Sequence, residues 1–204
     1  MAGPTPEFWQ VRFEAGQTPW DRGEASPQLL AWAVSDALPP QGSRIAVPGC
    51  GSGWEVAELA ARGLQVTGLD YAPAPVQRTQ KLLAERGLQA RAVQADVLQW
   101  QPGAPLDAVY EQTCLCALHP DQWKAYAGQL HEWLQPGGQL FALFVQERRP
   151  GSETGAIEGP PYHCDINAMR ALFPEPAWAW PKPPYSRVPH PIGWFELAVV
   201  LVRR

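Results

Sequence analysis

The sequence has no long apolar run. Its longest, residues 197–202, suits a buried strand and falls well below the roughly 18 residues that a membrane-spanning helix requires. Residues 1–7 also lack the basic start and apolar stretch of a secretory signal. We therefore expect a soluble, cytoplasmic protein with no membrane partner.

The sequence also lacks a large excess of charge of either sign. The 204 residues carry a formal net charge of −4, and their 16 Lys and Arg residues are scattered along the chain. A nucleic-acid-binding surface requires a basic stripe or patch. We therefore expect no nucleic-acid partner, and a small molecule is the more plausible one.

Paired cysteines are absent as well. The four cysteines are Cys50, Cys114, Cys116 and Cys164, and no two have the Cys-x-x-Cys spacing. A chain of this length can bury one sizeable α/β core without disulfides. Cys114 and Cys116 could be considered as ligands of a soft metal, but a closed site needs four donors. We expect buried free thiols and no metal.

Short apolar runs alternate with helical patterns from residue 44 onward. This alternation predicts a mostly parallel sheet with helices on both faces. The expected strands are 44–47, 65–69, 90–94, 107–111, 139–145 and 195–203. The expected helices are 6–15, 26–38, 54–62, 74–86, 121–134 and 165–173. A seventh strand within residues 174–194, paired with the last one as a hairpin, would make the sheet mixed.

The first of these strands leads into a glycine loop that opens a helix. Gly49, Gly51 and Gly53 let the backbone turn tightly and approach a ligand, with Cys50 inside the loop. A dinucleotide fingerprint would require glycine at Trp54, where an indole opposes docking of a pyrophosphate. The spacing instead indicates a nucleoside–amino-acid cofactor, S-adenosylmethionine.

Acidic residues follow the next two strands. Asp70 can accept hydrogen bonds from both ribose hydroxyls, and Tyr71 beside it is assigned to the same site. Asp96 can accept from an adenine amino group while Val97 offers its backbone amide. The alternatives are a helix cap at Asp70 and a turn-forming role for Asp96.

Five stretches resemble the thiopurine methyltransferase superfamily, particularly its plant and microbial thiol and halide methyltransferase branch. They are residues 16–21, 47–53, 68–70, 95–97 and 159–162. The resemblance implies a Rossmann-like class I methyltransferase of one domain, 1–204. Within it we expect an N-terminal helical lid over 1–40, a cofactor-binding core over 44–145, and a substrate-cover segment with the last strands over 146–204.

The same resemblance implies further site residues. Trp20 would pack against the cofactor, Glu111 and Gln112 would face its methionine end, and Tyr162 would help to enclose the acceptor. Aromatic faces suit a sulfonium cation, and an enclosed methyl group must be kept from water.

The expected reaction is methyl transfer to a small soft nucleophile. The candidates are a thiopurine, an aryl thiol, hydrosulfide, thiocyanate or a halide, which need little help from a base. His163 could orient the acceptor or take its proton, whereas His190, in an unmatched loop, is a weaker candidate. The alternatives are an O- or N-methyltransferase of a small metabolite and a non-catalytic cofactor-binding module. We expect a monomer.

Overall fold

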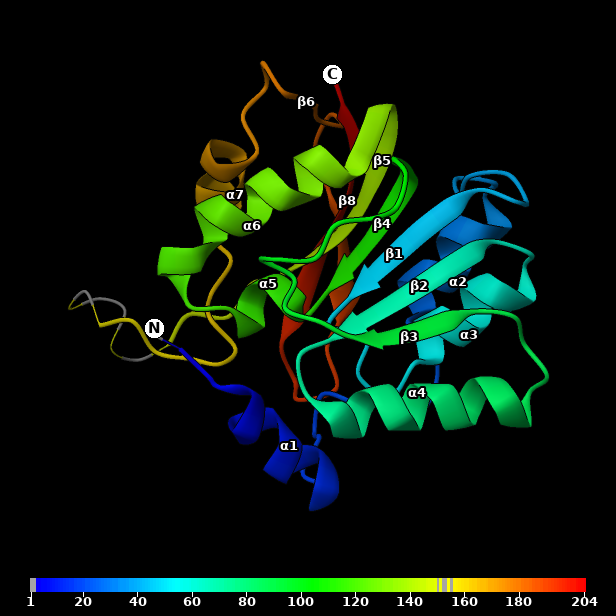
Figure 1. The fold of residues 1–204 in the computed structure, drawn as a ribbon. Helices are drawn as coiled ribbons and strands as arrows, with labels where there is room; N and C mark the ends of the chain where they lie inside the picture. The colour runs from blue at the N-terminus through cyan, green and yellow to red at the C-terminus, as the bar shows by residue number, and fades with distance from the viewer. Residues whose placement is uncertain (1–2, 150, 152–153, 155) are drawn as a thin grey trace.

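A mixed sheet runs through the centre of the molecule (Figure 1). The computed structural model describes residues 3–149, 151, 154 and 156–204. In this part of the chain, eight strands form one sheet in the order β3-β2-β1-β4-β5-β8-β6, with β7 paired to β8.

The elements follow the expected alternation closely. The strands are β1 (Arg44–Pro48), β2 (Gln65–Asp70), β3 (Arg91–Gln94), β4 (Leu106–Gln112), β5 (Leu134–Val145), β6 (Trp178–Ala179), β7 (Ser186–Pro189) and β8 (Phe195–Arg203). The helices are α1 (Pro6–Glu14), α2 (Pro27–Val34), α3 (Trp54–Ala61), α4 (Pro73–Glu85), α5 (Cys114–Ala117), α6 (Pro120–Trp133) and α7 (Ile166–Leu172).

The register places the ends of the parallel strands at one edge of the sheet. β1 pairs with β2 and β4, β2 with β3, and β4 with β5, all in parallel. β8 is antiparallel to β5, and β7 is antiparallel to β8, which confirms the expected hairpin. The sheet has one strand more than the seven expected, because the two-residue β6 is too short to leave a pattern in the sequence.

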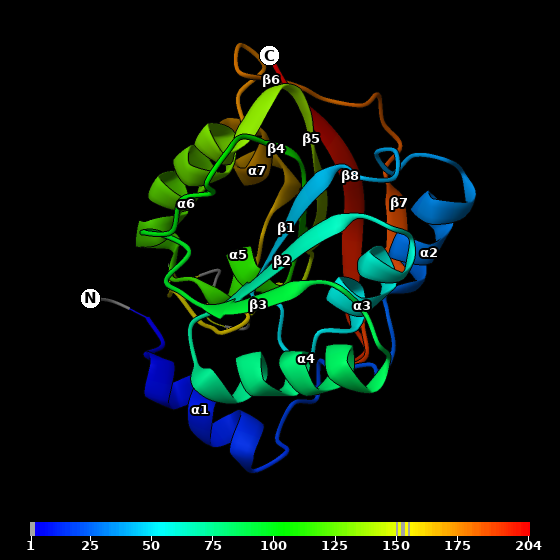
Figure 2. The ribbon, with the colours of Figure 1, turned by 45° about the vertical axis from the view of Figure 1, so that its right-hand side comes forward.

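Helices cover both faces of the sheet (Figure 2). Side chains alternate along each strand, so β5 presents Leu140 and Phe144 to one face and Phe141 and Leu143 to the other. The first face packs against α6 and α7, and the second against α2 and α3. None of the helices in the described ranges is long and apolar enough to cross a membrane.

The N-terminal helices have different places in the fold. α1 packs against α4 at the edge where the parallel strands end, whereas α2 buries Leu29 and Trp32 against the sheet. Of the expected helical lid, only α1 therefore lies at the edge that carries the glycine loop. α2 ends at Val34 rather than near residue 38, because Asp36 takes a left-handed backbone with φ 53°.

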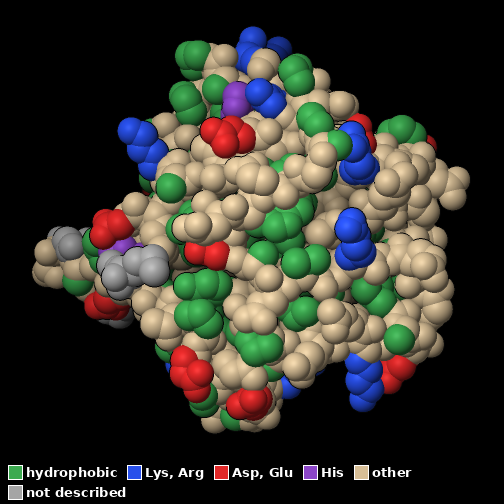
Figure 3. Space-filling view, in the orientation of Figure 1, with side chains coloured by type: hydrophobic (Ala, Val, Ile, Leu, Met, Phe, Trp, Pro, Cys, Tyr) green, Lys and Arg blue, Asp and Glu red, His purple; other side chains and the backbone are tan. Residues whose placement is uncertain are grey.

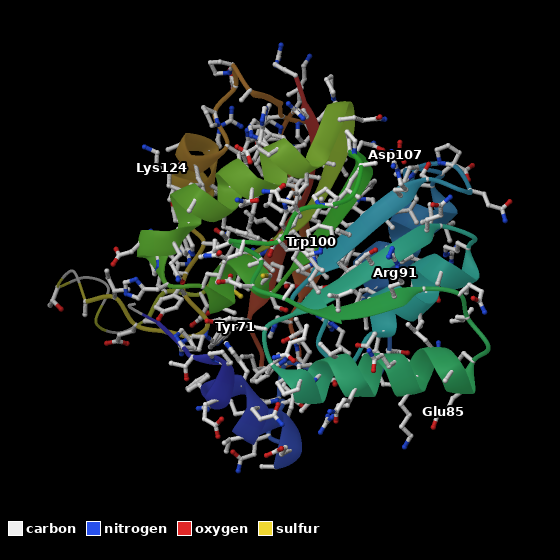
Figure 4. All side chains as sticks on the ribbon, in the orientation of Figure 1. Tyr71, Glu85, Arg91, Trp100, Asp107 and Lys124 are labelled. Carbon is white, nitrogen blue, oxygen red and sulfur yellow. The ribbon has the colours of Figure 1, made fainter. Side chains whose placement is uncertain are left out.

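The connection from β3 to β4 passes in front of the sheet without a helix in its described residues. Trp100 lies near the middle of this face (Figure 4) and packs edge-on against Trp133, with 5.0 Å between ring centroids. The Trp133 indole donates to the Trp100 carbonyl at 3.0 Å. A tryptophan pair therefore anchors this connection where a helix would otherwise cover the sheet.

Candidate active site

A cavity of about 220 Å³ opens at the carboxyl ends of the parallel strands. Tyr71 lies at this edge, near α1, whereas Asp107 lies at the opposite edge (Figure 4). The cavity is lined by many of the residues expected to bind the cofactor, namely Trp20, Gly49, Gly51, Asp70, Tyr71, Asp96 and Val97. The structure thus brings together three strand ends that are separate in the sequence.

A smaller cavity of about 70 Å³ adjoins the first one. Cys50 and Gln112, both expected at the cofactor, line it. The two cavities share Trp20, Gly49, Gly51 and Thr113, so together they form one elongated site.

The glycine loop requires its glycines for different reasons. Gly49 has φ +63°, and a Cβ there would lie 3.0 Å from the Cβ of Cys114. Gly53 has φ +83°, and a Cβ there would lie 2.8 Å from the Cβ of Thr79. Gly53 begins α3 and does not belong to the described lining of either cavity, so its role is the close packing of α3 on α4.

Asp70 is a buried carboxylate at the end of β2. Its Oδ2 accepts from the Gly51 backbone amide at 3.0 Å, and its Oδ1 accepts from the Ala72 amide at 3.2 Å. Burial raises the pKa of Asp70 to about 6, against the effect of these amides. The carboxylate therefore ties β2 to the glycine loop, and it would gain from further donors that reach it through the cavity.

Asp96 and Val97 line the cavity after β3. Asp96 Oδ1 accepts from the Leu98 amide at 2.9 Å, so the turn-forming role expected as the alternative is present. This turn presents the residue to the cavity and does not exclude a contact with a ligand.

An aromatic wall closes the cavity on the N-terminal side. Trp20 makes edge-on contacts with Trp9 at 5.7 Å and Phe13 at 6.2 Å between ring centroids. Asp21, the next residue, accepts from the Trp54 indole at 2.8 Å and from the Ser52 hydroxyl. Sequence reasoning missed Asp21, which holds Trp20 against the glycine loop.

Glu111 does not face the cavity as expected. Its side chain is 1% exposed, and its Oε1 accepts from the Leu115 amide at the start of α5, at 2.7 Å. Burial raises the pKa of this carboxyl to about 7. Successive side chains of a strand point to opposite faces, so Glu111 and Gln112 cannot both reach the same cavity.

Gln112 reaches the smaller cavity but is already engaged. Its Nε2 donates to both carboxylate oxygens of Glu196, at 3.0 and 3.3 Å. Its Oε1 accepts from the Tyr110 hydroxyl at 2.7 Å. Gln112 therefore joins β4 to β8 across the sheet beneath the small cavity.

Thr113 lies where the two cavities meet and has a strained backbone. Its φ of +66° is rare for a β-branched residue. Its hydroxyl donates to the Gln112 carbonyl at 2.6 Å. Such strain is typical of functional sites, where the surrounding structure holds it in place.

Tyr162 and His163 lie outside the described lining of the cavity, contrary to expectation. The Tyr162 amide donates to the Cys116 carbonyl at 2.7 Å, and its buried ring packs edge-on against His119. His163 Nε2 lies 3.8 Å from Asp165 Oδ2. The preceding prolines, Pro160 and Pro161, line the cavity instead.

Another histidine does line the cavity. His190 and Ile192 reach it from the loop between β7 and β8. No spacing in the sequence marks this loop, because its position depends on the pairing of the hairpin with the sheet. In the part of the chain that the structure describes, no group of three or more His, Cys, Asp and Glu side chains could hold a metal ion.

A Rossmann-like sheet with a glycine loop after β1 and a carboxylate after β2, both at a cavity, is a nucleotide-binding arrangement that class I S-adenosylmethionine-dependent methyltransferases share. Solved structures share this fold. One, described as "Conversion of a Disulfide Bond into a Thioacetal Group during Echinomycin Biosynthesis", has a TM-score of 0.75 at 25% identity and covers 97% of this chain and 92% of its own. The N-methyltransferase NodS from Bradyrhizobium japonicum WM9, in complex with S-adenosyl-L-homocysteine, has a TM-score of 0.74 at 18% identity and covers 98% and 99%.

The chain belongs to the thiopurine S-methyltransferase family, whose profile matches residues 4–181. It is 28% identical to "Probable thiol methyltransferase 2" of Arabidopsis thaliana over 94% of this chain and 75% of that protein. It is 30% identical to "Thiocyanate methyltransferase 1" of Brassica oleracea, over 81% and 70%, and 28% identical to "Thiopurine S-methyltransferase" of Legionella pneumophila (strain Paris), over 76% and 74%. The protein is therefore an S-adenosylmethionine-dependent methyltransferase, which confirms the expected fold, family, enzyme class and cofactor.

Proposed function

We propose that the protein transfers the methyl group of S-adenosylmethionine to the sulfur of a small thiol, or to a similarly soft anion such as thiocyanate or a halide. Its relatives carry the names of thiol, thiocyanate and thiopurine methyltransferases. The observation that carries the proposal is the makeup of the cavity beyond Asp70 and Asp96. There the described lining residues include prolines, Ile192, Cys116 and Leu118 but no carboxylate.

The residues at the strand ends fit this cofactor. Asp70 is a desolvated carboxylate beside open space, and ribose hydroxyls would supply the donors that it lacks. We assign the adenine to Asp96 and Val97, and the methionine end to the smaller cavity at Gly49, Cys50, Gly51 and Gln112. Trp20 and Tyr71 would provide packing surfaces.

When bound, S-adenosylmethionine supplies an electrophilic methyl group on a sulfonium centre. The aromatic wall around Trp20 favours a cation nearby and excludes water. The protein must also hold the acceptor in line with the methyl group. Positioning of the two reactants alone can lower the activation barrier by several kcal/mol. A thiolate or halide already carries the electron pair that forms the new bond.

The geometry favours sulfur acceptors over the alternatives. An alcohol or amine acceptor would need a base at the methyl group, whereas Glu111 accepts from the start of α5 and Glu55, in the smaller cavity, accepts from the Ser26 amide. A non-catalytic module would have a blocked acceptor space, whereas here the cavity extends past the strand ends to Pro160 and His190. Tyr162 and His163 then act indirectly, by holding the segment that carries Pro160 and Pro161.

The test is turnover with a panel of acceptors. Purified protein is incubated with S-adenosylmethionine and hydrosulfide, thiocyanate, iodide, an aryl thiol, a thiopurine or catechol, and formation of S-adenosylhomocysteine is measured. We expect turnover with sulfur acceptors or iodide and none with catechol. Turnover of catechol alone would contradict the proposal.

The partner of the enzyme is proposed to be a small molecule. On the face shown in Figure 3, the Lys and Arg side chains are interspersed with Asp and Glu side chains and form no extended basic patch. We further propose that the enzyme is a cytoplasmic monomer that binds no nucleic acid, which sedimentation, cell fractionation and a gel-shift assay would test.

A further inference from the structure

The loop between β7 and β8 places a polar side chain at the acceptor end of the cavity. His190 lies outside residues 4–181, the part of the chain that the family profile matches. We propose that the Nε2–H group of His190 binds and orients an anionic acceptor, a thiolate, thiocyanate or halide, for methyl transfer. This inference rests on the proposed function and assigns a residue to its acceptor site.

The hairpin holds the His190 ring in one place. The His190 amide donates to the Trp194 carbonyl at 2.9 Å, and the Gly193 amide donates to the His190 carbonyl at 3.0 Å. The ring stacks on Trp194, with 6.0 Å between centroids and 25° between planes. His190 is only 6% exposed and yet lines the cavity, so its ring is fixed against the hairpin on one side and meets the open space on the other.

The hydrogen bonds of the ring indicate which nitrogen carries the proton. Nδ1 accepts from the Ile192 amide in a long contact of 3.5 Å. A neutral ring that accepts at Nδ1 has its proton on Nε2. Burial and the neighbouring Arg22 lower the pKa of His190 to about 4, so the ring is neutral near pH 7. The ring's hydrogen bond within the described residues is made at Nδ1, so Nε2 remains a donor for a ligand.

Several other polar groups at this end already form hydrogen bonds within the protein. The Cys116 thiol donates to the Thr113 carbonyl at 3.3 Å, and the Thr113 hydroxyl donates to the Gln112 carbonyl. Arg12, near the N-terminal wall, donates to the Phe8 carbonyl at 3.2 Å. The imidazole of His190 differs from these groups because it is a deeply buried donor that lines the cavity.

The charge around His190 favours an anion. Arg22 donates to the Pro189 carbonyl, next to His190, and its Nη2 lies 3.9 Å from Glu196 Oε2. Burial raises the pKa of Glu196 to about 8, which weakens its ion pair with Arg22 near pH 7. The positive charge of Arg22 behind this neutral donor attracts a soft anion. Because Nε2 of the neutral ring already carries its proton, it cannot accept the proton of an alcohol.

The experiment measures thiocyanate binding without turnover. The protein is saturated with S-adenosylhomocysteine, thiocyanate is titrated in by calorimetry, and KM and kcat for thiocyanate are measured separately with S-adenosylmethionine. The variants are His190→Phe, which keeps a ring on Trp194 but has no donor, and His190→Gln, which restores an amide donor. His131→Phe is the matched control, because His131 also packs on a tryptophan, Trp178, away from the cavity.

We expect His190→Phe to weaken thiocyanate binding and raise KM by roughly tenfold, with little change in the affinity for S-adenosylhomocysteine. His190→Gln should recover most of the loss, and His131→Phe should match the wild type. Equal thiocyanate binding and KM in His190→Phe and wild type would overturn the inference and leave the proposed function standing.

Two further outcomes also test the role of His190. If His190→Phe fails to fold, His190→Met and His190→Gln make the same comparison, because they have similar length and only the amide can donate. If wild-type protein methylates catechol and none of the sulfur or halide acceptors, the proposed function fails, and the inference fails with it.

Discussion

The cofactor side of the cavity consists of loops that directly follow β1, β2 and β3, whereas the acceptor side is assembled from α1, residues 160–161 and residues 190–192. Strand register fixes the first set, since neighbouring parallel strands end at one edge. A few contacts between distant segments fix the second, such as those of Arg22 with Pro189 and Glu196. The cofactor side is therefore tied to the fold, while the acceptor side can change without altering the sheet.

The largest effect is expected on the cofactor side. Asp70→Ala removes a buried carboxylate that would bind two ribose hydroxyls, and it should lower the affinity for S-adenosylhomocysteine by roughly 100-fold. Isothermal calorimetry measures this loss. Asp107→Ala is the control at the opposite edge, where the carboxylate accepts from the Arg44 amide, so it should lower Tm and leave the affinity intact. An unchanged affinity in Asp70→Ala would show that the strand ends do not bind the cofactor.

A second change should affect the acceptor side most. Arg22→Met removes the tie between the N-terminal segment and the hairpin that carries His190. We expect KM for thiocyanate to rise by roughly tenfold, because charged hydrogen bonds of this kind contribute a few kcal/mol at most. Steady-state kinetics measure the change. Arg22 also lines the smaller cavity, so an equal loss of affinity for S-adenosylhomocysteine would show that it acts mainly on the cofactor.

A pH dependence should separate the two sides further. The pKa of Asp70 is raised to about 6, so the protein binds a proton there below pH 6 and loses the carboxylate that accepts from ribose. Affinity for S-adenosylhomocysteine should therefore be full above this pKa and fall by roughly tenfold at pH 5. Unliganded stability has the opposite sign: the raised folded pKa favours folding below the unfolded value, and this advantage is lost as pH rises through 6. Calorimetry at pH 5 and at a pH above the pKa of Asp70 checks the binding prediction. In Asp70→Asn, the affinity for S-adenosylhomocysteine should hardly change between the two.

The smallest effect concerns strain at the junction of the two cavities. Thr113→Gly relieves a left-handed backbone and should raise the stability by about 1 kcal/mol, or a Tm shift of a few degrees, while turnover falls. Asp36→Gly relieves a similar φ away from the cavity and should stabilise without affecting turnover. Thermal unfolding and thiocyanate kinetics measure both. A Thr113→Gly enzyme of full activity would show that this strain has no role in the reaction.

The same contrast explains how far the sequence could predict the site. Gly49, Asp70 and Asp96 follow short apolar runs, and a local pattern suffices to place them at one edge of a parallel sheet. The family resemblance implies that Glu111 and Gln112 both face the cofactor, whereas strand alternation turns Glu111 towards α5 and away from Gln112.

The acceptor side could not be predicted in the same way. The prolines at 160 and 161, rather than Tyr162, line the cavity because the Tyr162 amide bonds to Cys116 and its ring packs on His119. His190 reaches the cavity through the pairing of β7 with β8, whose partner residues lie far along the chain from the glycine loop. Local patterns carry no information on such contacts.

The contacts of Arg22 with Pro189 and Glu196 affect the order in which the site assembles during synthesis of the chain. The glycine loop, Asp70 and Asp96 all leave the ribosome long before residues 186–203 are synthesised, so the nucleoside half of the site can assemble early. The acceptor half waits for β8 to insert beside β5 and bring His190 to Arg22. A nascent chain stalled before its last strand would therefore have the strand ends that bind the nucleoside but no acceptor half.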